Sequence, residues 1–345
     1  MNSQEQPGPA TRWRGPGAPA FAPRRGRSGG RRLLGVVAAC LGVLVAAIAV
    51  NAVVLSGQTE AARITVPGAR LVPTAEGTMQ VLVQGDRSGS PVLEVHGVLS
   101  SLHWFDRITP ILDRHHLVIR VDLIGNGGSA KPGPGHYSIP DQARAVGDVL
   151  ARLHIQHVTA IGHSMGGAVV TALAQHDPAD VARIVVIDTS AVAADATLGG
   201  QARLSTEPVI GQALKTLVSV AGSKNIASQG FAPGFRPGTG FVHADQPLDD
   251  IKAMTYTAYT QEMAAFGPFV TAEPMQRRLT SLRKPVLVIF GTRDQIAVGE
   301  RHDLRLYRTV PGAIVATIAG AGHSPQVEAP QRTAALIRDF LRRAR

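Results

Sequence analysis

Short apolar runs alternate along the chain with longer segments that have the spacing of an amphipathic helix. Residues 138–153 carry apolar side chains at positions i, i+3, i+4 and i+7, which predicts a helix. A second helix is predicted at the C-terminus, where one face would hold Leu336, Ile337, Phe340 and Leu341. Strands that alternate with helices predict a mostly parallel sheet with helices on both faces. The runs typical of buried strands cover residues 77–85, 91–98, 117–122, 158–161, 181–188, 285–290 and 313–318.

The longest apolar run, residues 33–55, precedes all of these strands. Its 23 residues contain one strongly polar side chain, Asn51, and a helix of this length can span a bilayer. Arginines crowd its N-terminal side, so we expect a single-pass protein of the cell membrane with a cytoplasmic N-terminus and an extracytoplasmic domain. A cleavable signal peptide is the alternative. It is disfavoured because the run is longer than a usual signal core and no clear A-x-A site follows.

The formal charge of +10 is unevenly distributed. Residues 1–32 contain seven Arg and one acid and carry +6, which leaves +4 for the rest of the chain. A Pro-, Gly- and Arg-rich segment of this kind cannot bury enough apolar surface to fold, so we predict a disordered basic tail over residues 1–32. A linker over residues 56–64 and a folded domain over residues 65–345 complete the predicted organisation. We expect no nucleic-acid partner; the expected partners are a small-molecule substrate and, through residues 33–55, the membrane.

Cys40 is the only cysteine, and it lies inside the long apolar run. The folded domain therefore has no cysteine for a disulfide, a metal site or a nucleophile. A lipoprotein signal at Cys40 is disfavoured because the apolar run continues well beyond it. The histidines at 115, 116, 154 and 157 lack the nearby acidic residues of a zinc site, so we expect neither a metal nor a cofactor.

One G-x-S-x-G motif, Gly162-His163-Ser164-Met165-Gly166, lies between an apolar β-rich run and a run of small apolar residues. Strand, sharp turn and helix form the context in which such a serine is strained and exposed as a nucleophile. The flanking glycines allow the strand and the helix to approach closely.

A second motif, His96-Gly97, ends the predicted strand at 91–98. A strand that ends in His-Gly fits the loop that supplies one amide of an oxyanion hole, although an ordinary exit from a strand into a turn has the same appearance. The expected donors are the backbone N–H groups of Val98 and Met165. The Gly-rich turn at 123–129 lacks the G-K-[ST] ending of a phosphate loop.

Taken together, His96-Gly97, the segment from Asp122 to Pro132 and the motif Gly162–Gly167 resemble the α/β-hydrolase fold. The likeness extends from about residue 65 to the C-terminus and is greatest to the esterase, C–C-bond hydrolase and cofactor-free haloperoxidase-like branch. It implies an α/β-hydrolase domain with a helical cap insertion, preceded here by one transmembrane helix. Asn126 stands where many relatives have His, a position outside the triad, so this difference bears only on substrate preference.

Asp294 and His323 each follow a predicted strand, at the edge of the sheet where ligands bind. With Ser164 they complete the order Ser, Asp, His that this fold requires. His323 would take the proton of Ser164, and Asp294 would fix the imidazole tautomer. Asp188 also follows a strand and is a rival for the acid, but Gly-x-x-Asp ahead of the terminal His resembles the family spacing and favours Asp294.

The segment 189–282 is expected to be the cap. It contains seven of the 15 aromatic residues in less than a third of the chain, which fits a small, largely apolar substrate, although these rings could equally form the cap's own core. Residues 230–240 are rich in Pro and Gly and should be irregular.

We expect a serine hydrolase that cleaves a carboxylic ester or related acyl bond through an acyl-enzyme. C–C-bond hydrolysis of a diketone with the same triad is one alternative, and a low-turnover ligand-binding module is another. Away from this chemistry, Glu94 and Arg120 occupy equivalent positions on strands expected to be neighbours, which predicts a partly buried ion pair.

Overall fold

A computed structural model describes residues 28–61, 66–196 and 230–343. The chain divides into two units, residues 1–47 and 48–345. Helix α1 (Ser28–Ala61) contains the stretch Leu33–Val50, and it is the one helix among the described residues that is long and apolar enough to cross a membrane, by length and composition. A signal sequence would share these properties.

Helix α1 is longer than the apolar run inside it. It includes residues 28–32 of the predicted tail and residues 56–61 of the predicted linker. An established helix extends at little cost through residues that tolerate it, which explains the difference. The remaining parts of the predicted tail and linker, residues 1–27 and 62–65, lie outside the described residues.

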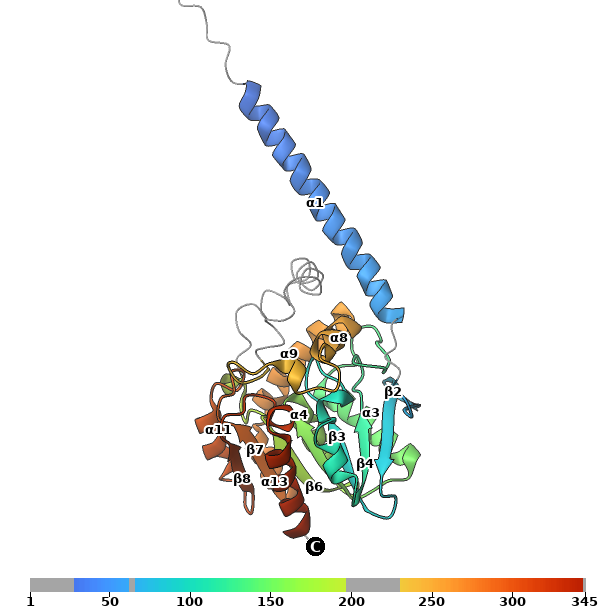
Figure 1. Ribbon diagram of the computed structural model, residues 1–345, viewed down its shortest axis with the longest axis vertical. Coiled ribbons are helices and arrows are strands. Elements are labelled where there is room, and N and C mark those ends of the chain that lie inside the picture. The colour runs from blue at the N-terminus through green and yellow to red at the C-terminus, as the bar shows by residue number, and fades with distance from the viewer. Residues whose placement is uncertain (1–27, 62–65, 197–229, 344–345) are drawn as a thin grey trace, which may run out of the picture. The chain divides into compact units, whose positions relative to one another are not determined.

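The domain is built on a sheet whose described strands run in the order β1-β2-β4-β3-β5-β6-β7-β8 (Figure 1). Strands β1 and β2 are antiparallel to their neighbours, and all other pairs are parallel, as the alternating pattern predicts. The strands are β1 Arg70–Thr74, β2 Gly77–Gly85, β3 Ser90–Val95, β4 His116–Val121, β5 Val158–His163, β6 Val181–Ile187, β7 Val286–Gly291 and β8 Ile314–Ile318.

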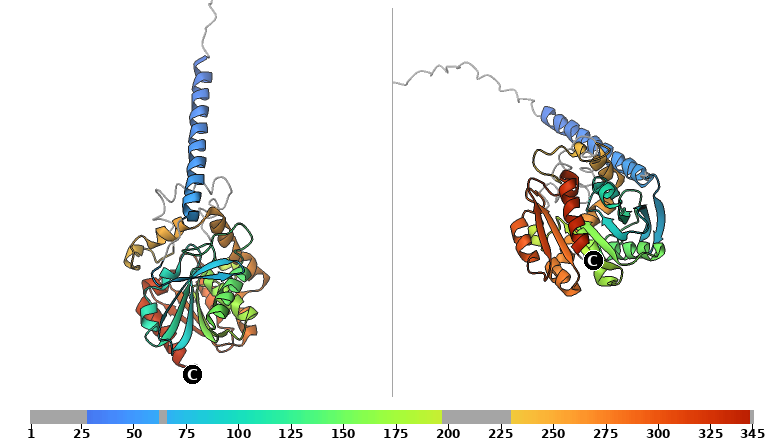
Figure 2. Two further views of the ribbon diagram at one scale, coloured as in Figure 1. Left: turned by 90° about the vertical axis from the view of Figure 1, so that its right-hand side faces the viewer. Right: turned by 60° about the horizontal axis from the view of Figure 1, so that its bottom comes forward.

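Helices cover both faces of this sheet (Figure 2). Helices α3 (Ile139–Leu153), α4 (Met165–His176), α10 (Met275–Leu282) and α11 (Glu300–Tyr307) bury their apolar residues in one cluster. Helices α2 (Thr109–Leu112) and α13 (Pro330–Arg343) belong to a second cluster on the opposite face. Alternate residues of the strands fill the two clusters, because successive side chains of a strand point to opposite faces.

Strand β1 is absent from the sequence-based prediction. It lies at the edge of the sheet, contains Pro73 and buries only Val72, so it lacks the mostly apolar sequence of the inner strands.

The cap helices follow β6. They are α8 (Gln246–Ala253) and α9 (Tyr256–Ala272), followed by α10. Residues 230–245 contain turns and the short 3-10 helix η4 (Pro237–Thr239), as their Pro and Gly content predicts. Further short elements are the 3-10 helices η1 (Leu102–Phe105) and η2 (Ala193–Asp195) and helix α12 (Pro325–Glu328). Residues 197–229 of the predicted cap lie outside the described residues.

The predicted Glu94–Arg120 pair is present but is more buried and looser than expected. The two residues are register partners on β3 and β4, and Arg120 Nε lies 3.8 Å from Glu94 Oε2, beyond hydrogen-bond distance. Glu94 Oε2 instead accepts from Thr109 at 2.7 Å, while the Arg120 guanidinium bonds Asp106 and the Leu102 carbonyl. Burial raises the pKa of Glu94 to about 7 despite the positive charge of Arg120.

Candidate active site

Ser164 occupies the turn between β5 and α4 in a conformation that side-chain-bearing residues rarely adopt. Its φ is 52° and its ψ is −120°. Two hydrogen bonds fix this turn: the Ser164 amide donates to the Ile187 carbonyl at 2.8 Å, and the Thr189 hydroxyl donates to the Ser164 carbonyl at 2.9 Å. Backbone strain of this kind is maintained only where the surrounding fold imposes it, and it is typical of functional sites.

The glycines around this turn are required by close packing. A Cβ on Gly162 would lie 2.2 Å from the Gly166 carbonyl oxygen, and one on Gly166 would lie 2.3 Å from the Val95 carbonyl oxygen. A Cβ on Gly97 would lie 2.9 Å from the Cβ of Ser164. The loop after β3 therefore passes directly beside the serine, as the His96-Gly97 motif predicts.

His323 and Asp294 meet above the carboxyl ends of β7 and β8. The Nδ1 atom of His323 lies 2.7 Å from Asp294 Oδ2, and Asp294 Oδ1 accepts from the amides of Ile296 and Ala297 at 2.7 and 3.0 Å. Burial opposes ionisation of Asp294, but His323 and these amides outweigh it and lower the pKa of Asp294 to about 2. An ionised Asp294 accepts a hydrogen bond from Nδ1–H of His323, which leaves Nε2 of His323 as a base.

The residue before the serine links the serine turn to the histidine loop. The Nε2 atom of His163 lies 2.7 Å from the His323 carbonyl oxygen, and the two rings are 5.1 Å apart between centroids. His163 and Ser164 are adjacent in the chain, so this contact brings the serine turn and His323 to the same place. The structure thus gathers Ser164, His323 and Asp294 at one edge of the sheet.

A histidine that the motif did not single out for a role, His96, braces the loop beside Ser164. Its Nε2 accepts from the Leu123 amide at 3.0 Å, so its Nδ1 carries the proton and donates to the Gly97 carbonyl at 2.7 Å. Burial lowers the pKa of His96 and favours this neutral form. Among the described residues, neither the Val98 amide nor the Met165 amide donates to another group. Both remain available to a ligand.

The segment from Asp122 to Ser129 has a structural role in this protein. Asp122 accepts from the Leu102 amide, the Gly128 amide and the Gln80 side chain at 2.7–2.9 Å. Ser129 donates to the Asp122 carbonyl at 2.6 Å. These bonds fold the Gly-rich turn back on β4, so the segment shapes the site without supplying a reactive group.

Asn126 forms a buried contact with the cap that the sequence did not reveal. Its Nδ2 donates to Glu262 Oε1 on helix α9. The two remaining oxygens, Asn126 Oδ1 and Glu262 Oε2, have no partner among the described residues. Burial raises the pKa of Glu262 well above its usual value. A protonated Glu262 can donate to Asn126 Oδ1, which would complete a two-bond acid–amide pair between cap and core.

Aromatic rings of the cap pack against Trp104 of η1. Trp104 stacks on Phe231 and on His163, with centroids 5.5 and 5.9 Å apart, and meets Phe241 edge to face at 5.3 Å. Phe231 is fully buried by its neighbours. These rings therefore form a packed core between cap and domain, rather than a core within the cap alone.

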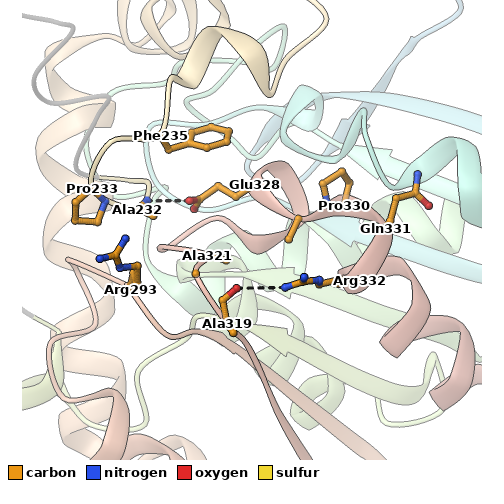
Figure 3. Close-up of a pocket in the computed structure, with 12 residues that line it drawn as sticks. Ala232, Pro233, Phe235, Arg293, Ala319, Ala321, Glu328, Pro330, Gln331 and Arg332 are labelled. Atoms are coloured by element: carbon orange, nitrogen blue, oxygen red, sulfur yellow. Dashed lines mark hydrogen bonds between the residues drawn. The ribbon is translucent and has the colours of Figure 1, made fainter.

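A pocket of about 500 Å³ opens beyond this cluster (Figure 3). It is lined by Phe235 of the cap, by Arg293 and by Glu328, which accepts from the Ala232 amide at 2.8 Å. Arg332 lies across the pocket and donates to the Ala319 carbonyl at 3.3 Å. Ser164, Asp294 and His323 are not among its lining residues.

The family model for the alpha/beta hydrolase family matches residues 92–336. The chain belongs to the α/β-hydrolase family. Its fold and its elements from β3 to α13 are those expected of this family. The chain is a hydrolase of this fold, and the strained serine between β5 and α4 occupies the position that a nucleophile takes in it.

Two curated relatives and one solved structure illustrate the range of this family. The chain is 26% identical to the 2-hydroxy-6-oxo-2,4-heptadienoate hydrolase of Pseudomonas putida, over 74% of this chain and 90% of the relative. It is 27% identical to Lipase 3 of a Moraxella species, over 75% of this chain and 80% of the lipase. The crystal structure of the enol-lactonase of Burkholderia xenovorans superposes with a TM-score of 0.64 over 79% of this chain and 99% of the lactonase. The sequence identity is 19%, so this is a likeness of fold.

Proposed function

We propose that the protein is a serine hydrolase that cleaves a carboxylic ester, or a related acyl bond, of a small and largely apolar substrate. The observation that carries the proposal is the strained Ser164, whose neighbour His163 bonds the backbone of a His323 with its Nδ1 held by Asp294. Lipase 3 of Moraxella, an ester hydrolase by its name, supports the same reaction class.

In the proposed reaction, His323 Nε2 accepts the Ser164 hydroxyl proton as Oγ attacks the ester carbonyl carbon. The amides of Val98 and Met165 donate to the oxyanion that forms. His323 then donates the proton to the leaving alkoxide, the ester C–O bond breaks, and an acyl group remains on Ser164. Water, deprotonated by His323, releases the acid and restores the serine. Asp294 holds the imidazole throughout and stabilises its protonated form.

Labelling with a fluorophosphonate tests this proposal. The full-length chain in detergent should form a covalent adduct, and the variant Ser164→Ala should not. Thr171→Ala, which removes a buried hydroxyl of helix α4 that donates to the Gly167 carbonyl, is a matched control and should still be labelled. Absence of labelling in the wild type would overturn the serine mechanism and favour the low-turnover ligand-binding module. Turnover of p-nitrophenyl esters of increasing chain length would then define the acyl group.

Hydrolysis of a C–C bond is a second candidate, because the Pseudomonas putida relative is named as a dienoate hydrolase. The same serine, histidine and aspartate would serve both reactions. A vinylogous 1,5-diketone and a matched aryl ester, assayed in parallel, separate them. A kcat/KM at least about tenfold higher for the diketone, equivalent to about 1.4 kcal/mol, would favour C–C cleavage.

We further propose that α1 anchors the protein in the cell membrane with the hydrolase domain outside the cytoplasm. The arginines that precede Leu33 support this orientation. Protease added to intact cells should digest the domain, and protection of the domain would contradict the orientation. The apparent mass of the mature chain distinguishes a retained helix from a cleaved signal sequence.

A further inference from the structure

Asp188, the residue that follows β6, is a buried carboxyl with no part in the proposed chemistry. The residue is 1% exposed. One oxygen, Oδ1, accepts from the Gly291 amide at 2.9 Å, while Oδ2 has no donor among the described residues. An ionised carboxylate with a single hydrogen bond is costly to bury, so this group requires an explanation.

The neighbours of Asp188 explain how a carboxyl can be buried at this position. An oxygen of Asp188, an oxygen of Asp294 and a ring nitrogen of His323 all lie within 4.8 Å of one another. Two carboxylates this close in a buried site do not both ionise, so the pair retains one proton. Asp294 accepts from three donors, which stabilise its charge, whereas Asp188 accepts from one. The proton therefore belongs on Asp188.

The charges around the pair agree with this assignment. Burial, and after it the negative charge of Asp294, raise the pKa of Asp188 well above its usual value, and Glu328 acts in the same direction. The pKa of Asp294 is lowered to about 2. The ionisable groups that act on the pair are thus His323, Glu328 and, through Asp294, Glu300 and His163.

The backbone at Asp188 is also fixed in an unusual conformation. Its φ is 45°, in the left-handed region, and its amide donates to the Ile289 carbonyl at 2.8 Å. Together with the bond from Gly291 to Oδ1, this clamps the end of β6 onto β7, the strand that leads to Asp294. The fold thus holds the Asp188 carboxyl against the acid that orients His323.

We propose that Asp188 is a positioning residue that keeps its proton and donates an O–H hydrogen bond to the Asp294 carboxylate. That bond holds Asp294 in the orientation that receives Nδ1–H of His323. The inference rests on the proposed serine hydrolase function for its kinetic consequences. Its structural content, a protonated carboxyl at position 188, stands independently of that function.

The variants Asp188→Asn and Asp188→Ala of the full-length chain separate this role from others. The amide retains an N–H donor, so Asp188→Asn should keep kcat within about threefold of the wild type. Asp188→Ala should lose about 10- to 100-fold in kcat with KM almost unchanged, the range for one hydrogen bond to a charged group. Ionisation of Asp188 should also impose an alkaline decline in kcat that Asp188→Asn lacks. Thermal unfolding verifies that each variant is folded.

A kcat for Asp188→Asn as low as that of Asp188→Ala would overturn the proposal, because a charge rather than a donor would then be needed. An unchanged kcat in Asp188→Ala would overturn it as well. If Asp294→Asn retains most of the activity and the double variant with Asp188→Asn loses it, Asp188 is itself the acid that orients His323, and the proposal is wrong.

A second measurement does not depend on catalysis. The infrared difference spectrum of wild type minus Asp188→Asn at neutral pH should contain the C=O stretch of a protonated carboxylic acid. Asp303→Asn is the matched control, since Asp303 is a buried carboxyl outside the proposed triad whose pKa is raised to about 8. The Asp303→Asn variant should remove a different acid band and leave kcat unchanged.

If fluorophosphonate fails to label the wild type, the proposed function is wrong, but the infrared band still decides the protonation state of Asp188. A carboxylate band from Asp188 in its place would overturn the assignment.

Discussion

The imidazole of His163 is bonded to the backbone of His323, a residue 160 positions away in the sequence. Nε2 of His163 lies 2.7 Å from the His323 carbonyl oxygen and donates a hydrogen bond to it. Burial, together with the neighbouring His323, lowers the pKa of His163 to about 3, so this donor stays neutral throughout the pH range in which a hydrolase of this kind works. The bond ties the serine turn to the loop that presents the proposed base.

Removal of this bond should slow the reaction without weakening substrate binding. We expect His163→Ala to lower kcat about tenfold and the free energy of unfolding by about 1–3 kcal/mol, because a buried carbonyl loses its donor. His163→Gln retains a side-chain N–H and should recover part of both losses. Ester kinetics and thermal unfolding of the full-length variants measure them. A wild-type kcat in His163→Ala would show that the bond has no part in placing His323.

Local patterns were sufficient to predict the inner strands and the serine turn. The inner strands are mostly apolar because both faces are buried, and G-x-S-x-G is a local signal for a tight turn. The structure pairs His323 with Asp294, as the Gly-x-x-Asp spacing favoured over Asp188. Edge strand β1 was missed because it buries little.

Contacts between distant segments could not be predicted in the same way. The bonds of His163 to His323 and of Asn126 to Glu262 join residues 160 and 136 positions apart. They depend on strand order and on the placement of the cap, which no short motif encodes. The role of Asp188 beside Asp294 arises likewise from the pairing of β6 with β7.

The acid of the proposed triad should be needed for its charge. Asp294→Asn keeps the size of the side chain but favours the wrong imidazole tautomer, so we expect kcat to fall by about 10³- to 10⁴-fold. The pKa of Asp294 is lowered to about 2, so its contribution to stability is present above its unfolded value of 3.8 and is lost only as the pH falls through about 2. Ester kinetics from pH 5 to pH 9 measure the fall in kcat. A kcat for Asp294→Asn within about tenfold of the wild-type value would contradict the need for this charge.

The glycines of the serine turn should tolerate no side chain. In Gly162→Ala the new Cβ would meet the backbone of Gly166 at 2.2 Å, where no rotamer change can relieve the contact. We expect a loss of at least about 1–3 kcal/mol in the free energy of unfolding, the usual cost of overpacking. Gly133→Ala is the control, because nothing lies within 4 Å of its added Cβ. Chemical denaturation of both variants tests the difference; equal stability would show that the β5–α4 turn can relax.

The contact between Asn126 and Glu262 should make the stability of the domain depend on pH. Burial raises the pKa of Glu262 well above its unfolded value of 4.5, so the folded state binds this proton more tightly than the unfolded chain. The contribution of the Glu262 proton to the free energy of unfolding is therefore complete below pH 4.5. It declines as the pH rises towards the pKa of Glu262 in the folded protein. Glu94 and Asp250, each with a pKa raised to about 7, act in the same direction.

Glu262→Gln isolates the share of this residue. An amide at 262 can donate to Asn126 Oδ1 and accept from Asn126 Nδ2, which satisfies both oxygens now without partners and leaves nothing to ionise. We expect this variant to match the wild type at pH 5 and to exceed its free energy of unfolding by about 1–3 kcal/mol at pH 8. Glu273→Gln, a more exposed carboxyl at the end of α9, serves as the control and should follow the wild type at both values. If the free energy of unfolding of Glu262→Gln and of the wild type changed in parallel with pH, Glu262 would be ionised in the folded protein. The cap would then be held by a charged contact.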